Sequence, residues 1–334
     1  MKNVKLKLAV LGALSVVSAQ AMANLVSLPA AGLSVSAGTN QVAGTTGYVE
    51  CNTTGNYGTG TPTAPTSSSD PCHVIPASSN GNNPPPSSQV GGVTFSSVSA
   101  PANVTVTANS ETLATLVQRV FRNSANTQCL YLKRLQMATT GTYDYNPQLT
   151  GSNRLEVNDI ALGGFSSTTN VLAGYWQSIA SDSPVFRMGR AFTAVQMQAD
   201  PTNDTLIANG FIRRPVNSPA PAASTEINGV GQTASSTGTP PGADPGTVTP
   251  TAAQQTAEIR TNWVNFTLDI TGGVDEDGDT EPNSPFLYVS AGCTSAAPVT
   301  TANTIRIRQT GQETQPFVTI LTSGQTRTGA NANF

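Results

Sequence analysis

The stretch Trp263-Val-Asn-Phe-Thr-Leu-Asp-Ile270 decides the fold class. Apolar side chains occupy every second position of it, and Asn265, Thr267 and Asp269 occupy the positions between them. Alternation with a period of two is typical of a β-strand that has one buried and one solvated face. The stretch therefore predicts a half-buried strand, and it is the clearest one in the chain.

Similar but shorter patterns recur along the chain and are separated by turn-forming residues such as Thr139-Thr140-Gly141. Further strands are predicted within 26–28, 33–35, 93–95, 104–106, 113–121, 130–137, 155–162, 174–179, 185–197, 205–212, 286–289, 305–308 and 317–321. A single short helix is predicted at 252–260, capped by Thr251. This series of short strands without alternating helices indicates an all-β protein, an antiparallel β-sandwich or jelly-roll-like domain with long low-complexity loops.

Basic residues inside the predicted strands are expected to lie on the solvent-exposed faces of those strands. Arg119, Arg122, Lys133 and Arg134 fall in the strands predicted at 113–121 and 130–137 or directly beside them. The run Ile305-Arg-Ile-Arg308 repeats the pattern. Because charged side chains are rarely buried, we expect these residues to face solvent.

The first 23 residues predict a Sec-type signal peptide. Lys2, Lys5 and Lys7 form a positive region, an apolar core of about ten residues follows, and Ala21-Met22-Ala23 is a small-x-small cleavage site. The core is too short to span a membrane as a helix. We expect export to the periplasm, the cell surface or the extracellular space, and no membrane-spanning segment.

The rest of the chain divides by composition. We expect an N-terminal strand segment at 24–50, a low-complexity loop at 51–90 closed by a disulfide, and a β-sandwich domain at 91–322. That domain contains a Pro/Ser/Thr-rich excursion at 215–250, and a flexible C-terminal tail follows at 323–334.

Charge is scarce in this chain. Only 10 % of its 334 residues are charged, against about 25 % in an ordinary soluble domain. Removal of the signal leaves 13 basic and 19 acidic residues, a net charge of −6, and Lys133 as the last lysine. Phosphate binding requires a basic surface, so nucleic acid is excluded as a partner.

Four cysteines, Cys51, Cys72, Cys129 and Cys293, allow three disulfide connectivities. We favour Cys51–Cys72, inside the low-complexity stretch, and Cys129–Cys293, which ties the two halves of the chain together. Disulfides are typical of exported proteins. A zinc site is disfavoured, because the chain has one histidine and no CxxC spacing.

The sharpest local motif is Asp275-Glu-Asp-Gly-Asp-Thr-Glu281, which holds five of the 19 acidic residues. Asp275, Asp277, Asp279 and Glu281 have the alternating spacing of a calcium loop. Thr280 stands where an EF-hand requires glycine, and Phe286 where it requires the bidentate glutamate. Two interpretations remain: an irregular Ca²⁺ site, and a solvated hairpin tip that turns at Asp277-Gly278.

Catalytic chemistry has little support in the sequence. His73, the only histidine, lies in a Pro/Ser-rich loop, and no GxSxG motif occurs. Lys133 is expected to be an outward-facing charge rather than the base of a Ser-Lys dyad. Trp176 and Trp263 are expected to pack in the core rather than to stack on sugars.

These features favour an exported, non-enzymatic protein with a structural, adhesive or matrix role at the cell surface or outside it. Segment 24–37 could assemble subunits by adding a strand to a neighbour; the alternative is that it pairs with its own sheet or is frayed. A calcium-assisted carbohydrate- or ligand-binding module and a secreted hydrolase are the other two classes. The expected partners are a second copy of the chain or cell-surface and matrix components.

Overall fold

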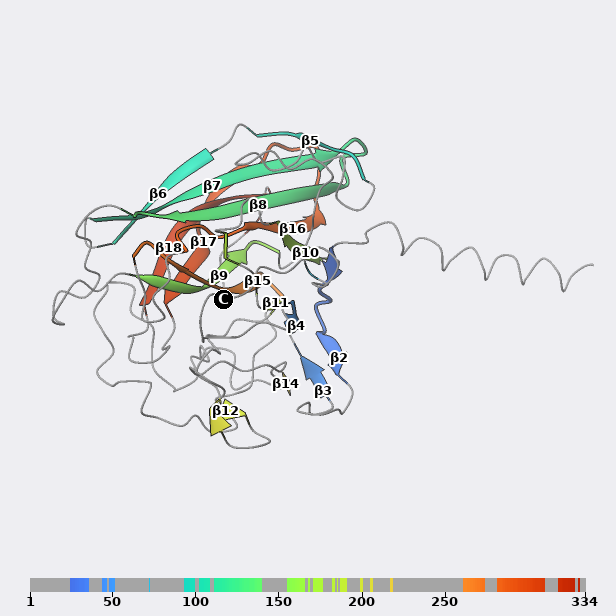
Figure 1. The fold of residues 1–334 in the computed structure, drawn as a ribbon. Coiled ribbons are helices and arrows are strands. Elements are labelled where there is room, and N and C mark those ends of the chain that lie inside the picture. The colour runs from blue at the N-terminus through green and yellow to red at the C-terminus, as the bar shows by residue number, and fades with distance from the viewer. Residues whose placement is uncertain are drawn as a thin grey trace, which may run out of the picture.

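A computed structural model of the chain describes residues 25–35, 44–46, 48–51, 72, 93–99, 102–108, 111–139, 155–165, 168, 171–176, 182–183, 185, 187–190, 199–200, 205–206, 217–218, 261–273, 281–309, 318–327 and 330 (Figure 1). These residues form an all-β structure with antiparallel sheets and no helix. The expected all-β class is therefore confirmed. The predicted helix at 252–260 lies outside the described residues.

The first half of the chain supplies strands β1 to β10. Their bounds are β1 Val26–Ser27, β2 Leu33–Val35, β3 Gly44–Thr46, β4 Tyr48–Glu50, β5 Phe95–Ser97, β6 Ala102–Ala108, β7 Glu111–Asn123, β8 Gln128–Met137, β9 Glu156–Gly163 and β10 Val171–Trp176. The second half supplies β11 Arg187–Gly189, β12 Ala199–Asp200, β13 Thr205–Leu206, β14 Asn217–Ser218, β15 Trp263–Thr271, β16 Phe286–Gly292, β17 Val299–Gln309 and β18 Val318–Thr326.

Two large sheets contain most of these strands. One has seven strands in the order β1-β10-β16-β8-β7-β5, with β6 also pairing with β7. The other has six strands in the order β18-β17-β9-β15-β11-β4. Figure 1 shows β7 and β8 on one side of the molecule and β9 and β15 on the other. Two small sheets, β12-β13 and β14-β3-β2, complete the described topology.

Both large sheets contribute to one hydrophobic core. The seven-stranded sheet supplies Leu116, Tyr131 and Leu287, among others, and the six-stranded sheet supplies side chains such as Ile160 and Phe266. A separate cluster contains Leu130, Leu132, Trp176, Phe286 and Tyr288 of the seven-stranded sheet. Because neighbouring residues of a strand point to opposite faces, Leu130 and Leu132 lie on the face of β8 opposite Tyr131. Both faces of this sheet are therefore covered.

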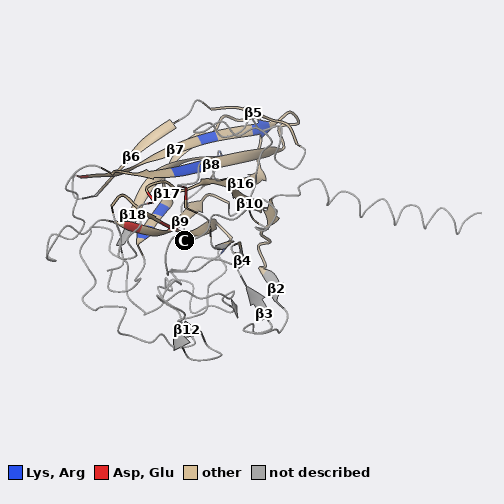
Figure 2. Ribbon diagram, in the orientation of Figure 1, with Lys and Arg blue, Asp and Glu red and all other residues tan. Residues whose placement is uncertain are grey.

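The expectation that the basic residues of β7, β8 and β17 face solvent is wrong for most of them. Lys133, Arg134 and Arg308 are 3 %, 1 % and 2 % exposed, and Arg122 is 9 % exposed. Figure 2 shows Lys and Arg positions on β7 and β8, which lie inside the seven-stranded sheet. The physical reason is that central strands covered on both faces have no wet side, so each charge is buried with polar partners instead.

The prediction that residues 263–270 are half-buried is also wrong in its detail. The strand exists as β15, but Asn265 is fully buried and Thr267 is 2 % exposed. Asn265 donates a hydrogen bond to Asp159 of β9, which also pairs with Arg308 at 2.6 Å. The polar face of β15 is thus part of a buried hydrogen-bonded cluster.

The N-terminal segment pairs with its own chain in this structure. Val26 of β1 lies opposite Ala173 of β10, and the amide of Leu28 donates to the carbonyl of Val171 at 2.8 Å. Strand β2 pairs with β3. At the other end, β18 runs to Thr326, so the first residues of the expected flexible tail belong to a sheet.

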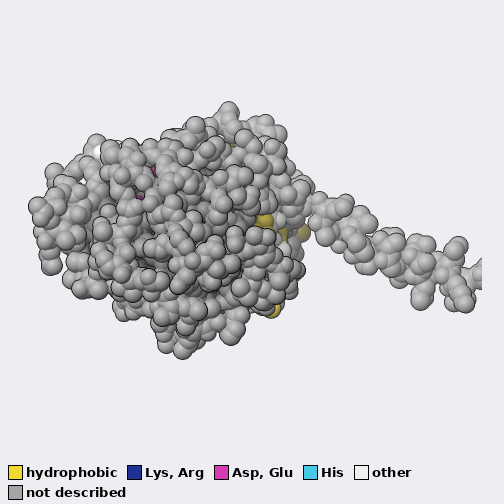
Figure 3. Space-filling view, turned by 60° about the horizontal axis from the view of Figure 1, so that its bottom comes forward, with side chains coloured by type: hydrophobic (Ala, Val, Ile, Leu, Met, Phe, Trp, Pro, Cys, Tyr) yellow, Lys and Arg dark blue, Asp and Glu magenta, His cyan; other side chains and the backbone are white. Residues whose placement is uncertain are grey.

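The described part of the surface offers few large apolar side chains. Among the described residues, Val299 and Leu321 are the exposed ones, at 39 % and 41 %. In the view of Figure 3, the visible hydrophobic side chains form a small group at one edge. No helix within the described ranges has the length and apolar character needed to cross a membrane.

Candidate functional site

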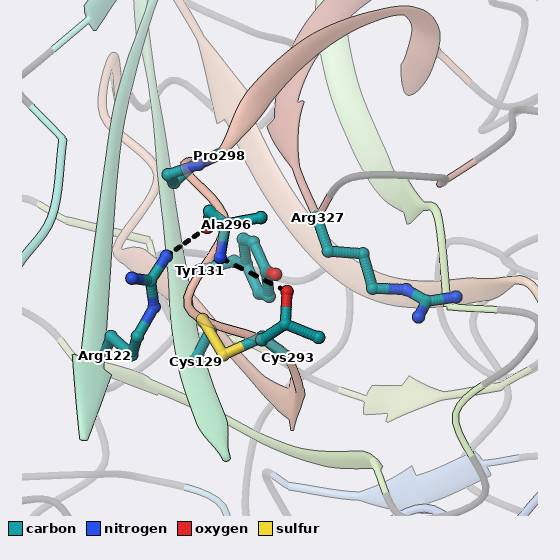
Figure 4. Close-up of a pocket in the computed structure, with 8 residues that line it drawn as sticks. Arg122, Cys129, Tyr131, Cys293, Ala296, Pro298 and Arg327 are labelled. Atoms are coloured by element: carbon teal, nitrogen blue, oxygen red, sulfur yellow. Dashed lines mark hydrogen bonds between the residues drawn. A yellow bond between two sulfur atoms is a disulfide. The ribbon is translucent and has the colours of Figure 1, made fainter. Parts of the chain in front are cut away.

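The candidate site is a small cavity beside the Cys129–Cys293 disulfide (Figure 4). Strand β7 supplies Arg122, and β8 supplies Cys129 and Tyr131. The connection between β16 and β17 and the residue after β18 supply the rest of the lining, namely Cys293, Thr294, Ala296, Pro298 and Arg327. The cavity therefore lies where both large sheets meet one connecting loop.

The β7–β8 hairpin fixes one wall of the cavity. Its turn is closed by Asn123, whose Oδ1 accepts hydrogen bonds from the amides of Thr127 and Gln128 at 2.9 and 3.0 Å. Asn126 adopts φ 56° in this turn, a conformation that asparagine tolerates better than most residues. The resulting register sets Arg122 directly opposite Cys129.

The disulfide forms the base of the cavity. Cys129 is 2 % exposed, whereas Cys293 is partly exposed. The amide of Cys293 also donates to the carbonyl of Thr127 at 3.1 Å, which holds the loop against the hairpin turn. The two cysteines of this bond therefore differ in their exposure to solvent.

Two arginines make the cavity electropositive. Arg122 donates from Nη1 to the carbonyl of Ser295 at 3.0 Å and from Nη2 to that of Ala296. Within the described part of the chain, its buried Nε has no hydrogen-bond partner. Arg327 donates from Nε to Gly164 O at 3.3 Å. Burial raises the pKa of Tyr131 to about 12, although both arginines act in the opposite direction. The site thus favours anions.

The cavity has a volume of about 30 Å³. That volume holds roughly two water molecules, since one water needs about 10–15 Å³ on the same measure. A small anionic group, such as one carboxylate or one thiolate, matches both the size and the sign of the site.

A second polar cluster joins the two large sheets around Lys133. Its Nζ donates to Gln118 Oε1 at 2.5 Å and to the carbonyl of Gln325 on β18 at 2.9 Å. Gln118 also donates to the carbonyl of Ser323 at 3.2 Å. Burial lowers the pKa of Lys133 to about 7. The expectation of an outward-facing lysine is wrong, because β18 covers this face of β8.

Arg134 lies on the other face of β8, in a buried ion pair. Its Nη2 is 2.5 Å from Asp182 Oδ1, and both side chains are at most 1 % exposed. The guanidinium also lies over the ring of Phe286, 5.2 Å from its centroid. Phe286 stacks on Trp176 with ring centroids 5.4 Å apart. Arg134 is therefore held by an ion pair and an aromatic face.

The four cysteines pair as Cys51–Cys72 and Cys129–Cys293, the connectivity that the sequence favours. Both Cys51 and Cys72 are fully buried, and the carbonyl of Cys72 accepts a hydrogen bond from the amide of Tyr175 at 3.3 Å. Trp176 and Trp263 are 1 % and 0 % exposed, so their predicted core positions are confirmed.

Most of the predicted calcium site lies outside the described residues, namely Asp275, Asp277 and Asp279. Glu281 is described, and its carbonyl accepts a hydrogen bond from the amide of Thr271 at 3.1 Å. This bond joins Thr271, the last residue of β15, to Glu281, the last residue of the acidic motif. His73 also lies outside the described residues. Within the described ranges no group of three or more His, Cys, Asp or Glu side chains has the arrangement of a metal site.

Sequence reasoning found the disulfide of the candidate site but missed the residues around it. Arg122 was expected to face solvent, and Tyr131 and Arg327 carried no motif. The sequence does contain one indication for Arg122. It directly precedes Asn123, where the turn begins, and Cys129 lies shortly after the turn. A hairpin there pairs Arg122 with Cys129.

The fold and the site together define an all-β, antiparallel protein with two disulfides. No protein-family model matches the chain, and no curated protein and no solved structure is significantly similar to it. Its function is therefore argued from its own residues.

Proposed function

We propose that the protein is exported and serves as a non-enzymatic structural component at or outside the cell surface. The observation that carries the proposal is where the buried basic side chains form their bonds. Lys133, Arg134 and Arg308 each bond to another part of the same fold rather than to an open cleft. Side chains used in this way connect different parts of one structure.

Export is supported by the signal-like first 23 residues and by the two disulfides. Disulfides persist in oxidising compartments and are rare in the reducing cytosol. Cys129–Cys293 joins positions 164 residues apart. In chain-entropy models such a long loop stabilises the fold by roughly 4–5 kcal/mol.

Within this proposal the two large sheets are the two layers of a sandwich. The support is their shared core and the bonds from Gln118 and Lys133 to β18 across the space between them. A disulfide-linked, two-layer β-domain is a common design for proteins that work outside the cell.

Assembly by strand addition is the mechanism that we propose for a structural role. Strand β1 has two residues and lies at the edge of the seven-stranded sheet, next to β10. Leu25 and Leu28 beside it are 7 % and 1 % exposed, and they belong to different core clusters. A neighbour's segment 24–37 could replace this strand, pair with β10 and insert the same two leucines.

The location is tested by immunogold labelling of intact cells of the organism that makes the protein. We expect gold particles on the surface of cells that have not been permeabilised. Gold that appears only after the outer envelope is opened would contradict a surface role.

The assembly mechanism is tested on the purified mature protein with and without residues 24–37. Wild-type protein should form species larger than a monomer in gel filtration and electron microscopy, and the deletion variant should not. Added back in excess, a peptide of residues 24–37 should bind the deletion variant. Equal sizes for the two proteins would eliminate strand addition.

A further inference from the structure

We propose that Cys129–Cys293 is a site of thiol–disulfide exchange, at which the thiolate of a small anionic thiol attacks Cys293. The proposal is independent of the surface role. It rests on a cavity whose lining includes both cysteines of a disulfide together with Arg122 and Arg327 (Figure 4).

The two cysteines of the bond differ in exposure, and this difference favours Cys293 as the attacked residue. Cys293 is partly exposed and is followed by exposed residues 294–297, whereas Cys129 is 2 % exposed within β8. An incoming thiolate therefore reaches Cys293 Sγ, and Cys129 Sγ is the leaving atom. Cys51 and Cys72 are both fully buried, so the second disulfide offers no such entry.

The positive charge of the two arginines favours both the approach of the attacking thiolate and the departure of the leaving thiolate. Exchange requires a thiolate, and it proceeds faster when the departing sulfur is stabilised as an anion. Arg327 and Arg122 both act electrostatically on the cavity, as their effect on Tyr131 shows. Arg122 lies opposite Cys129 in the β7–β8 register, and its Nε has no hydrogen-bond partner among the described residues. It is therefore placed to stabilise the Cys129 thiolate.

The reaction balances as two successive displacements. In the first, the thiolate RS⁻ forms a bond to Cys293 Sγ, the Cys129–Cys293 bond breaks, and Cys129 leaves as a thiolate that takes up a proton. In the second, another RS⁻ attacks the R sulfur of the mixed disulfide. This step releases RSSR and the Cys293 thiolate, so that the protein gains two electrons and two thiol molecules are oxidised.

The loop around Cys293 keeps other attachments when the bond opens. The amide of Cys293 still donates to Thr127 O, and Arg122 still holds Ser295 and Ala296. The β8–β16 pairing continues through Ala291 opposite Cys129. Exchange should therefore occur in the folded protein, without global unfolding.

The test uses the oxidised mature protein with two small thiols, anionic 2-mercaptoethanesulfonate and cationic cysteamine. Samples are quenched with iodoacetamide, and the alkylation of each cysteine is followed by mass spectrometry. We expect Cys129 and Cys293 to be released about tenfold faster than Cys51 and Cys72. Per thiolate, the anionic thiol should react faster than the cationic one, while tryptophan fluorescence stays native.

Charge variants separate the electrostatic role from a structural one. Arg327→Gln should lower the ratio of anionic to cationic rates by about threefold, because one positive charge is lost from the cavity. Arg119→Gln removes a charge from the opposite face of β7 and should leave the ratio unchanged. High salt should lower the ratio in the wild-type protein, a measurement that needs no variant.

Three results would overturn the proposal. They are release of both disulfides at one common rate, release of any cysteine only as fluorescence reports unfolding, and a rate ratio that neither Arg327→Gln nor salt changes.

Discussion

Lys133 of β8 donates a hydrogen bond to the carbonyl oxygen of Gln325 on β18, over 2.9 Å, and so links the two large sheets. Its second bond, to Gln118 Oε1, also ends on an uncharged atom. Lysine usually keeps its charged group in water. Burial of Lys133 should therefore make the free energy of unfolding depend on pH.

Stability should rise with pH in the window set by Lys133. Its pKa is about 7 in the folded protein and 10.5 in the unfolded chain, so the unfolded chain binds more protons between these values. The free energy of unfolding should rise by roughly 2 kcal/mol between pH 7 and pH 9. Lys133→Met should abolish this rise, and Arg119→Met should preserve it, in urea denaturation at each pH. If the Lys133→Met protein shows the full rise in unfolding free energy with pH, another group causes the rise.

Breaking the Arg134–Asp182 pair should be costly. Both side chains are buried, so Arg134→Met or Asp182→Asn alone leaves a buried charge without the opposite charge that compensates it. Each single variant should lose about 3–5 kcal/mol of unfolding free energy, and the double variant should lose much less than the sum. Denaturant melts of all four proteins measure this coupling. Additive losses would mean that the two residues do not stabilise each other.

Strand β1 should be anchored mainly by the leucines that flank it, Leu25 and Leu28. Leu28 is 1 % exposed, so Leu28→Ala should lower the unfolding free energy by about 2–4 kcal/mol through lost burial and the cavity left behind. Ser27 is exposed, and Ser27→Ala is the matched control that should change stability little. Thermal and urea unfolding measure both variants. Equal stability of the two would mean that β1 is not docked in solution.

Calcium binding by the 275–281 segment stays a prediction. If the segment is a calcium site of the extracellular type, calorimetry should show binding with a dissociation constant of about 10⁻⁴–10⁻³ M. Asp277→Asn/Asp279→Asn should abolish the heat, since it removes two ligand charges. Near-zero heats for both proteins would leave the hairpin-tip interpretation.

Much of the fold followed from local patterns. Alternating residues located β7, β8, β15 and β17, and cysteine positions indicated the disulfide connectivity. Strand periodicity depends on nearby sequence, and Cys51 and Cys72 share one low-complexity stretch. Cys129 and Cys293 are 164 residues apart, and they were paired because each lies in or beside a predicted strand. The short strands β1 and β2 were also located this way.

The positions of the charges could not be obtained in the same way. Polar residues in an alternating strand are assigned to water, but that assignment fails for a central strand covered on both faces. One sign was present in β8, where Leu130 and Leu132 point to one face and Tyr131 and Leu135 to the other. The partners of Lys133 and Arg134, which are Gln325 and Asp182, are distant in sequence, and no local pattern connects them.

The most direct test of a structural role for the buried charges is amine labelling of the native mature protein. Lys133 is the single lysine beyond residue 23, and it is 3 % exposed. An amine-reactive ester, followed by peptide mass spectrometry, should label the α-amino group and leave Lys133 unmodified until denaturant unfolds the chain. Modification of Lys133 at the rate of an exposed lysine, with native fluorescence retained, would contradict the account and place a reactive amine within reach of solvent.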